Sequence, residues 1–149
     1  MREIIFRARR IDNDGWVEGD LIQLHDGRKY IVNNKRGACI DDKGNFINTE
    51  EPFVCAFDPS TVGQYTGLKD RNGVRIFEGD VIQHMDARGF IRFGAYASAY
   101  SSEKTHVGFY IEWIVDRMLR IDVGFWADKR EVEVIGNIHD DGDMPEVWT

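Results

Sequence analysis

The stretch VGQYTGLKDRNGVRIFEGDVIQ, residues 62–83, carries the pattern that decides the fold class. At its centre stands Asn72-Gly73, a dipeptide that readily supplies the positive φ angles of a tight connection between strands. Aromatic, aliphatic and β-branched side chains lie on both sides of it, in Tyr65–Leu68 and in Val74–Phe77. The stretch therefore predicts two short antiparallel strands joined by a tight turn.

The same rhythm of strands and turns continues outside this stretch. Asp26-Gly27 separates Leu21–Leu24 from Arg28–Val32 and predicts a second hairpin. Apolar and polar residues alternate along 109–114 and 131–135, which is the period of a half-buried strand. Two short segments have the features of a helical turn: Asp58–Thr61, with a proline placed to start it, and Asp116–Ile121. We expect a mainly β protein, at most a β-rich α+β fold, built from short antiparallel strands.

One short pattern occurs twice, as VEGDLIQ at residues 17–23 and as FEGDVIQ at residues 77–83. Each copy follows a turn that contains glycine. Glycine allows a bend where a Cβ would clash, and the next Asp can accept hydrogen bonds from backbone N–H groups as a strand begins. Such a Gly-Asp corner is common in small SH3-like barrels. The pattern is compatible with a true duplication. It is equally compatible with one real barrel and a chance repeat of the motif.

The patterns divide the chain into two regions. We expect residues 1–61 to form an N-terminal β-hairpin region, a partial repeat if the duplication is real. We expect residues 62–149 to form an SH3-like β-barrel, with its strands within 62–138 and an acidic C-terminal tail. The two regions are expected to pack as one compact unit.

Composition excludes several classes of protein. The chain has 149 residues and a formal net charge of −7, which argues against a generic phosphate-neutralising surface. Its 42% hydrophobic content is enough for a real core. Two cysteines, Cys39 and Cys55, are too few for a disulfide scaffold, and we expect them to be reduced and mostly buried. We find no secretory signal or membrane span in the sequence, so we expect a cytoplasmic protein.

Three parts of the chain carry a family resemblance. The central block runs from Val62 to Gly73 and continues at Ile76–Val81. The opening Met1–Ala8 and the segment Val134–Ile138 match in the same way. The sequence resembles the YopX family of phage and prophage proteins over nearly its whole length.

The resemblance implies a β-rich fold with an SH3-like barrel and a tendency to oligomerise. It implies no catalytic residues, because the family has no established activity. The chain departs from the family at Arg9, where tryptophan is usual, and in the acidic tail around Pro145. The ends are therefore where partner or packing would differ.

The residues that could carry chemistry lack the spacing that chemistry needs. The four histidines are scattered: His25, His84, His106 and His139. The serines Ser98, Ser101 and Ser102 lie in an Ala/Ser/Tyr stretch without a nucleophile elbow, which we interpret as a mobile loop. No Gly-rich phosphate loop occurs. We expect no enzyme, no metal site and no cofactor.

Basic residues are concentrated near the N-terminus. Residues 1–36 hold eight basic and six acidic side chains, whereas the rest of the chain is strongly acidic. A nucleic-acid-associated regulatory factor is therefore the alternative function, with Arg9, Arg10, Arg28 and Lys29 as candidate contacts. The acidic remainder could instead mimic nucleic acid, and ordinary solvated strand faces explain the same charges.

We expect a phage or prophage accessory protein that acts by protein binding or oligomeric assembly, without catalysis. Its partners would be copies of itself or a host or phage protein, with no membrane involved. Six residues are candidates for a structural or interaction role: Gln64, Tyr65, Gly67, Glu78, Gly79 and Asp80. Tyr65 is expected to anchor this block to the core, the alternative being an outward recognition patch.

Overall fold

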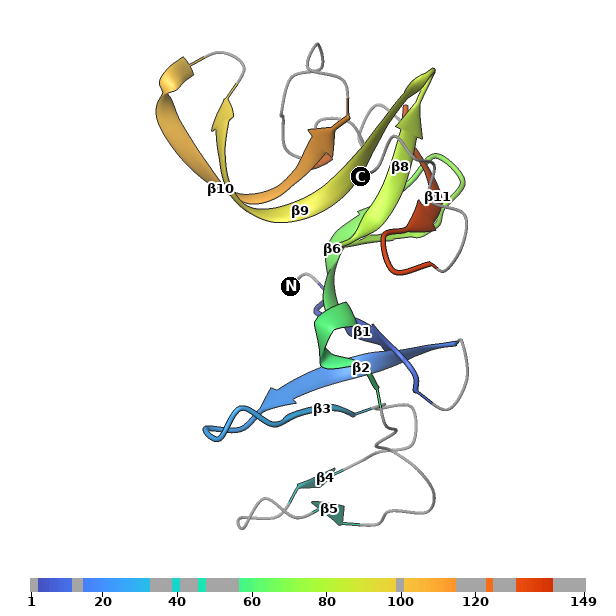
Figure 1. The fold of residues 1–149 in the computed structure, drawn as a ribbon, viewed down its shortest axis with the longest axis vertical. Helices are drawn as coiled ribbons and strands as arrows, with labels where there is room; N and C mark the ends of the chain where they lie inside the picture. Colours follow the sequence, from blue (N-terminus) through green and yellow to red (C-terminus); the bar gives the residue numbers. More distant parts are fainter. Residues whose placement is uncertain are drawn as a thin grey trace. The chain divides into compact units, whose positions relative to one another are not determined.

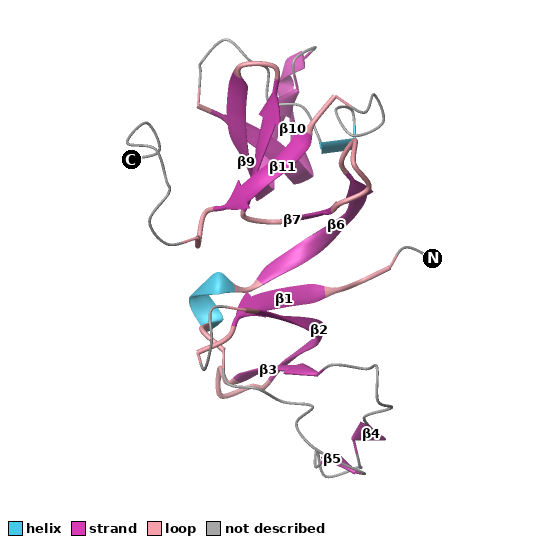
Figure 2. Ribbon diagram, turned by 90° about the vertical axis from the view of Figure 1, so that its right-hand side faces the viewer, coloured by secondary structure: helices cyan, strands magenta, loops and turns pink. Residues whose placement is uncertain are grey.

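The computed structural model describes residues 3–11, 15–32, 39–40, 46–47, 57–98, 101–114, 123–124 and 131–140. Strands dominate these residues (Figures 1 and 2), so the predicted mainly β class is confirmed. The strands are β1 Phe6–Arg9, β2 Trp16–Gln23, β3 Lys29–Val32, β4 Cys39–Ile40, β5 Phe46–Ile47, β6 Gly63–Lys69, β7 Arg75–Phe77, β8 Asp80–His84, β9 Ala87–Ser98, β10 Ser101–Trp113 and β11 Glu133–Asn137. The chain divides into two compact units, residues 1–64 and 65–149.

In the first unit, β2 pairs antiparallel with both β1 and β3. The β2–β3 connection is the predicted Asp26-Gly27 turn, closed by a 2.8 Å bond from the Leu24 N–H to the Arg28 carbonyl. The helical turn expected at Asp58–Thr61 forms as a 3₁₀ helix, η2 Pro59–Thr61, and the Asp58 side chain caps its start. The small core of this unit contains Ala8, Val17, Ile31 and Phe57.

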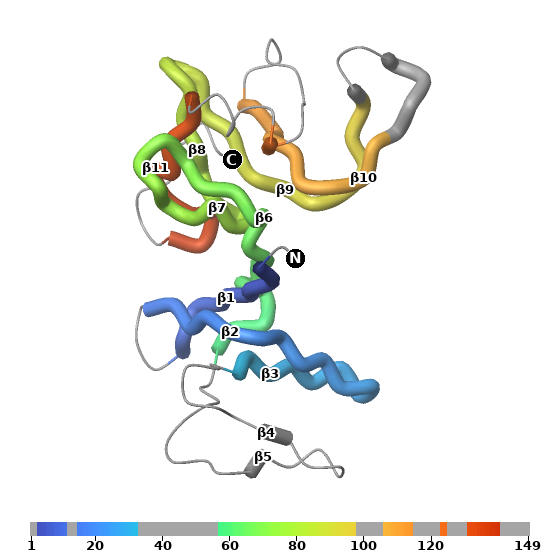
Figure 3. The backbone as a smooth tube through the Cα atoms, turned by 180° about the vertical axis from the view of Figure 1, so that it is seen from behind, coloured from blue at the N-terminus to red at the C-terminus, as the bar shows by residue number. Residues whose placement is uncertain are grey.

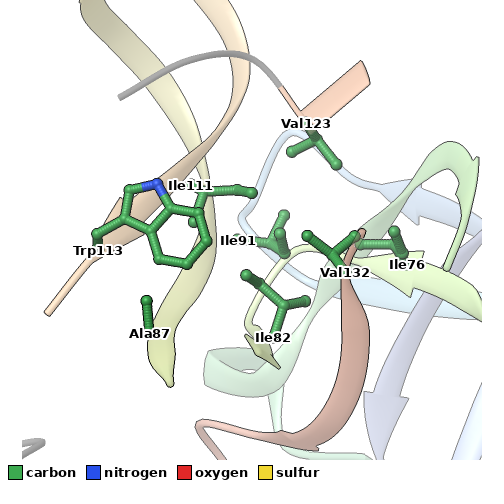
Figure 4. Packing of buried hydrophobic residues seen from close by; sticks show 8 residues of the cluster. All are labelled: Ile76, Ile82, Ala87, Ile91, Ile111, Trp113, Val123 and Val132. Carbon is green, nitrogen blue, oxygen red and sulfur yellow. The ribbon is translucent and has the colours of Figure 1, made fainter. Parts of the chain in front are cut away.

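In the second unit, four strands form one antiparallel sheet in the order β10-β9-β8-β11. The longest hairpin, β9–β10, bends along its length (Figures 1 and 3). Figure 4 shows the core: the buried side chains are Ile76, Ile82, Ala87, Ile91, Ile111, Trp113, Val123 and Val132. The described strands form an open, curved sheet accompanied by the β6–β7 hairpin, so closure into an SH3-like barrel stays a prediction.

The β6–β7 turn is held by one carboxylate, that of Asp70, which is 6% exposed. It accepts hydrogen bonds from the backbone N–H groups of Asn72 and Val74, at 2.8 and 2.9 Å. Its second oxygen accepts from the Val134 N–H at 2.9 Å. The predicted Asn72-Gly73 turn is confirmed, and Asp70 connects this turn to the edge strand β11.

The second Gly-Asp corner forms as the sequence predicts. Gly79 has φ +88°, a conformation that only glycine adopts without a steric cost. Its N–H donates to the Ile91 carbonyl at 2.8 Å, and its carbonyl accepts from the Ile138 N–H at 2.9 Å. The Asp80 carboxylate, 1% exposed, accepts from the Phe77 N–H at 2.8 Å and from the Asn137 side-chain amide at 3.0 Å. The corner therefore joins β7 and β8 to β9 and to the end of β11.

The first Gly-Asp segment has a different structure, so the expectation of a corner at residues 19–20 is wrong. Gly19 and Asp20 lie inside β2, where they pair with Phe6 and Val32. Gly19 is not among the glycines with a positive φ in the described residues. The neighbouring strands β1 and β3 keep this segment extended, whereas in the second copy β7 ends at Phe77 and β8 begins at Asp80, so that residues 78–79 lie between two strands.

The interpretation of the Ala/Ser/Tyr stretch as a mobile loop is also wrong for its described part. Residues 93–98 belong to β9, and Ser101 begins β10. Phe93 pairs with Phe109 and Tyr96 with His106 across the hairpin, and this pairing of rings outweighs the small residues between them. The expected helical turn at 116–121, the acidic tail after residue 140 and the side chains of Cys39 and Cys55 lie outside the described residues.

Replacing Asp80 by alanine should lower the free energy of unfolding by about 2–5 kcal/mol, because the buried Phe77 N–H and Asn137 amide lose their acceptor. Urea unfolding followed by circular dichroism measures the loss. Asp20→Ala is the matched control, because this residue holds the same place in the other copy of the pattern but is exposed in β2. We expect it to change stability by less than about 1 kcal/mol. Equal losses in the two variants would contradict the structural role of Asp80.

Candidate interaction surface

The β9–β10 hairpin has two different faces, because side chains alternate along each strand. Near its base, Ile91 and Ile111 face each other and are buried in the core. Farther out on the same face the pairs are Phe93 with Phe109 and Ala95 with Val107. We call these four residues, Phe93, Ala95, Val107 and Phe109, the apolar row.

The apolar row extends the core beyond the part that is covered. Phe93 is 55% exposed and Val107 is 72% exposed, whereas Phe109 packs partly against the core. The Phe93 and Phe109 rings meet edge to face, with their centroids 5.0 Å apart. The row is therefore preformed and apolar, as the centres of protein interfaces are.

The opposite face of the hairpin is aromatic and polar. The Tyr96 ring stacks on His106 at 5.6 Å and lies 5.3 Å from the Tyr110 ring. Next to them, the Arg92 guanidinium forms an ion pair with Glu112 at 2.7 Å. The paired glycines Gly94 and Gly108 add no side chain to this face, and a Cβ at Gly94 would meet the Tyr110 ring at 3.9 Å. This face offers flat rings and a paired charge, which suits contact with another polypeptide.

The structure places Tyr65 in the interior. Tyr65 is 5% exposed, and its ring lies 5.4 Å from that of Phe77 and 5.5 Å from the Arg75 guanidinium. The neighbouring Thr66 hydroxyl donates to the Ile76 carbonyl at 2.8 Å and accepts from the Leu68 N–H at 3.2 Å. Burial favours the structural interpretation of this block over an outward patch at Tyr65.

The other candidates of this group take different places. Gln64 is half-buried and lies opposite Phe6 where β6 meets β1 in the first unit. Gly67 is exposed at φ +85°, inside the bulged part of the β6–β7 pair. Glu78, Gly79 and Asp80 form the corner described above. The structure thus gives Gly79 and Asp80 a structural place and does not gather the six residues into one site.

The four candidate nucleic-acid contacts are not gathered either. Arg9 lies opposite Trp16 at one end of β2, and Lys29 lies opposite Gln23 at the other end. At about 3.4 Å per residue these two ends are about 24 Å apart. Arg10 forms an isolated bridge with Phe57, next to Arg9. The set is thus split between two places, and its binding of nucleic acid stays a prediction.

Two of these arginines already have partners within the chain. The Arg9 guanidinium lies 4.5 Å from the centre of the Trp16 ring. Arg28 forms a 2.7 Å ion pair with Asp26. The backbone N–H of Arg28, with its guanidinium, holds the pKa of the Asp26 carboxyl below its ordinary value, and the bond to Asp26 raises the pKa of Arg28. Both arginines would have to exchange a protein partner for a phosphate.

The sequence analysis did not identify the apolar row. Of the aromatic residues in this hairpin, Trp113 is 6% exposed and belongs to the core, whereas Phe93 is 55% exposed. The alternation of side chains along residues 89–98 and 105–113 is the sequence pattern that places the four residues of the apolar row on one face. It shows which side chains share a face, but it does not show how far along the hairpin the core extends.

In the described part of the chain, no group of three or more His, Cys, Asp or Glu residues is placed to hold a metal ion. His84 and His139 are both half-buried, and the bonds that involve them belong to the fold. The His84 ring contacts the Glu131 carbonyl at 2.9 Å, and the His139 N–H donates to the Asn137 side chain. The hairpin surface is therefore the feature of the described residues with the clearest functional character.

Truncating Tyr65 to alanine should cost about 3–5 kcal/mol of unfolding free energy, the usual cost of removing a buried aromatic ring. Tyr65→Phe keeps the ring and should cost less than about 1.5 kcal/mol. Thermal and urea unfolding of the two variants measure the difference. If Tyr65→Ala melts like the wild type, the block around Gln64 and Tyr65 becomes a candidate binding site.

The comparison with protein families supports the resemblance noted from the sequence. The family model of the YopX protein matches residues 5–144. This match covers most of each unit and the whole β9–β10 hairpin. A comparison with curated proteins found no match. The chain belongs to the YopX protein family.

Proposed function

We propose that this chain is a phage or prophage accessory protein that binds protein surfaces or assembles with its own copies, without catalysis. The apolar row on the β9–β10 hairpin carries the proposal. Phe93 and Val107 are large, exposed and held on a paired strand rather than on a loop. Complete burial of one such side chain against a partner contributes about 1.5–3 kcal/mol to the free energy of association.

The buried polar groups of the described residues support a role without catalysis. They are Thr61, Thr66, Asp70, Asp80 and Asn137. Each accepts from or donates to a backbone group in a turn, at a strand end or next to a strand. Their hydrogen-bonding capacity is used to hold the fold, and the exposed hairpin is left for recognition.

The phage or prophage setting, in the cytoplasm of a bacterial host cell, is part of the same proposal. Its support is the family membership, together with the resemblance to phage and prophage proteins noted from the sequence. Among the described residues, no helix has the length and apolar character needed to cross a membrane. The partner that we infer is a protein surface, either another copy of the chain or a host or phage protein.

The double variant Phe93→Asp with Val107→Asp should weaken association at least tenfold, because two anchors worth about 2 kcal/mol or more each are replaced by charges. Light scattering and sedimentation at micromolar concentration measure the association. Val74→Asp is the matched control: Val74 is an apolar residue that is 48% exposed in the β6–β7 turn, and its replacement should leave association unchanged.

Affinity capture from infected or lysogenic cells extends this test to other proteins. A wild-type chain that remains monomeric and captures no protein in stoichiometric amount would contradict the proposal. Capture of nucleic acid alone, with a steep dependence on salt, would favour the alternative function through Arg9, Arg10, Arg28 and Lys29.

A further inference from the structure

Strand β10 forms one end of the four-stranded sheet, with β9 on its inner side. No other strand of the described residues pairs with its outer side. It is also the longest strand described, Ser101–Trp113. A long edge strand with apolar side chains is a template for pairing with another chain.

The register shows which backbone groups of β10 point outward. The Ile114 N–H donates to the Arg88 carbonyl at 3.0 Å, so residue 114 forms a hydrogen-bonded pair with β9. Hydrogen-bonded pairs alternate with non-hydrogen-bonded ones in an antiparallel ladder, and the register is regular from residue 105 to residue 113. Gly108 therefore directs its N–H and carbonyl toward β9, whereas Val107 and Phe109 direct theirs to the outer edge.

The outer edge is complementary to itself about Gly108. When two copies of β10 run antiparallel with Gly108 opposite Gly108, each Val107 comes opposite the Phe109 of the other copy. These are the residues whose backbone groups point outward, so each such pair can exchange two N–H···O bonds. On the other face His106 comes opposite Tyr110. Backbone bonding and apolar contact both match in this one register.

We propose that the partner of this hairpin is a second copy of the chain, paired through β10 about a two-fold axis at Gly108. This rests on the proposed function and specifies its partner. Antiparallel pairing of identical strands is isologous and closes as a dimer. Both β10 edges are then paired, so no further copy can add to them. The two sheets become one continuous sheet, and the apolar rows of both copies become neighbours on one face of it.

Gly108 itself provides the test. Its φ is not in the positive range, and a Cβ built on it meets no atom within 4 Å, so a cysteine fits there. In the proposed register the two residues 108 form a non-hydrogen-bonded pair, with Cα atoms about 4.5 Å apart. Disulfides span Cα distances of about 4.4–6.8 Å. Gly108→Cys should therefore cross-link two copies under mild oxidation.

The experiment compares Gly108→Cys with His106→Cys and with the wild-type chain, which carries Cys39 and Cys55. In the proposed register the two residues 106 are about 14 Å apart, four strand steps, so they cannot cross-link. We expect a dimer band on a non-reducing gel for Gly108→Cys alone, with a 108–108 disulfide peptide identified by mass spectrometry. The yield should exceed that of His106→Cys at least tenfold.

A third variant tests the backbone ladder without a cysteine. Val107→Pro removes one outward N–H and leaves the bonds to β9 in place, since proline is tolerated where the N–H faces away from the sheet. We expect at least a tenfold loss of self-association, with an unchanged circular dichroism spectrum.

The outcomes separate this inference from the proposed function. Cross-linking at 106 as efficient as at 108, or no cross-link at 108 in a protein that light scattering shows to be oligomeric, overturns the β10 register and leaves assembly standing. Unchanged association in Val107→Pro also overturns it. A wild-type chain that is monomeric and captures a stoichiometric host or phage protein overturns the dimer but not protein binding. Failure of both self-association and capture overturns the two proposals together.

Discussion

The Asp80 carboxylate lies where several strands of the second unit meet, and it accepts hydrogen bonds from groups at the ends of two of them. It accepts from the Phe77 N–H at the end of β7 and from the Asn137 amide at the end of β11. Gly79, one residue earlier, donates to Ile91 of β9 and accepts from Ile138. Because the corner is buried, water cannot replace these partners. The order of β7, β8, β9 and β11 therefore depends on a turn whose positive φ only glycine adopts without strain, closed by the Asp80 carboxylate.

The position of this corner also explains why the hairpin is exposed. The corner and the turn held by Asp70 bring β6, β7 and β11 together with the base of β9 and β10, where Ile91, Ile111 and Trp113 are buried. The core ends there, but the strands continue. Residues that alternate in the same way farther along, such as Phe93 and Val107, keep their apolar side chains without a cover. The surface that we propose for binding is thus the uncovered continuation of the core.

The sequence predicted part of the candidate site. It pointed to Tyr65, Gly79 and Asp80, and the structure places all three where they hold the fold rather than at an exposed site. It did not point to the apolar row, because alternation shows which residues share a face and not whether that face is covered. For the basic residues, proximity along the chain suggested a patch, and the pairing of β2 with β1 and β3 puts Arg9 and Lys29 at opposite ends of a strand.

By itself the sequence determined the mainly β class, the two tight turns at Asp26-Gly27 and Asn72-Gly73, and the corner at Gly79-Asp80. These features depend on φ preferences and on hydrogen bonds between residues that are close along the chain. Only the tertiary structure decided that the same Glu-Gly-Asp motif is an extended strand at residues 18–20 and a corner at 78–80. The physical reason is that strand pairing is non-local: β1 and β3 hold residues 18–20 extended, whereas at 78–80 bonds to Ile91 and Asn137 favour the bend.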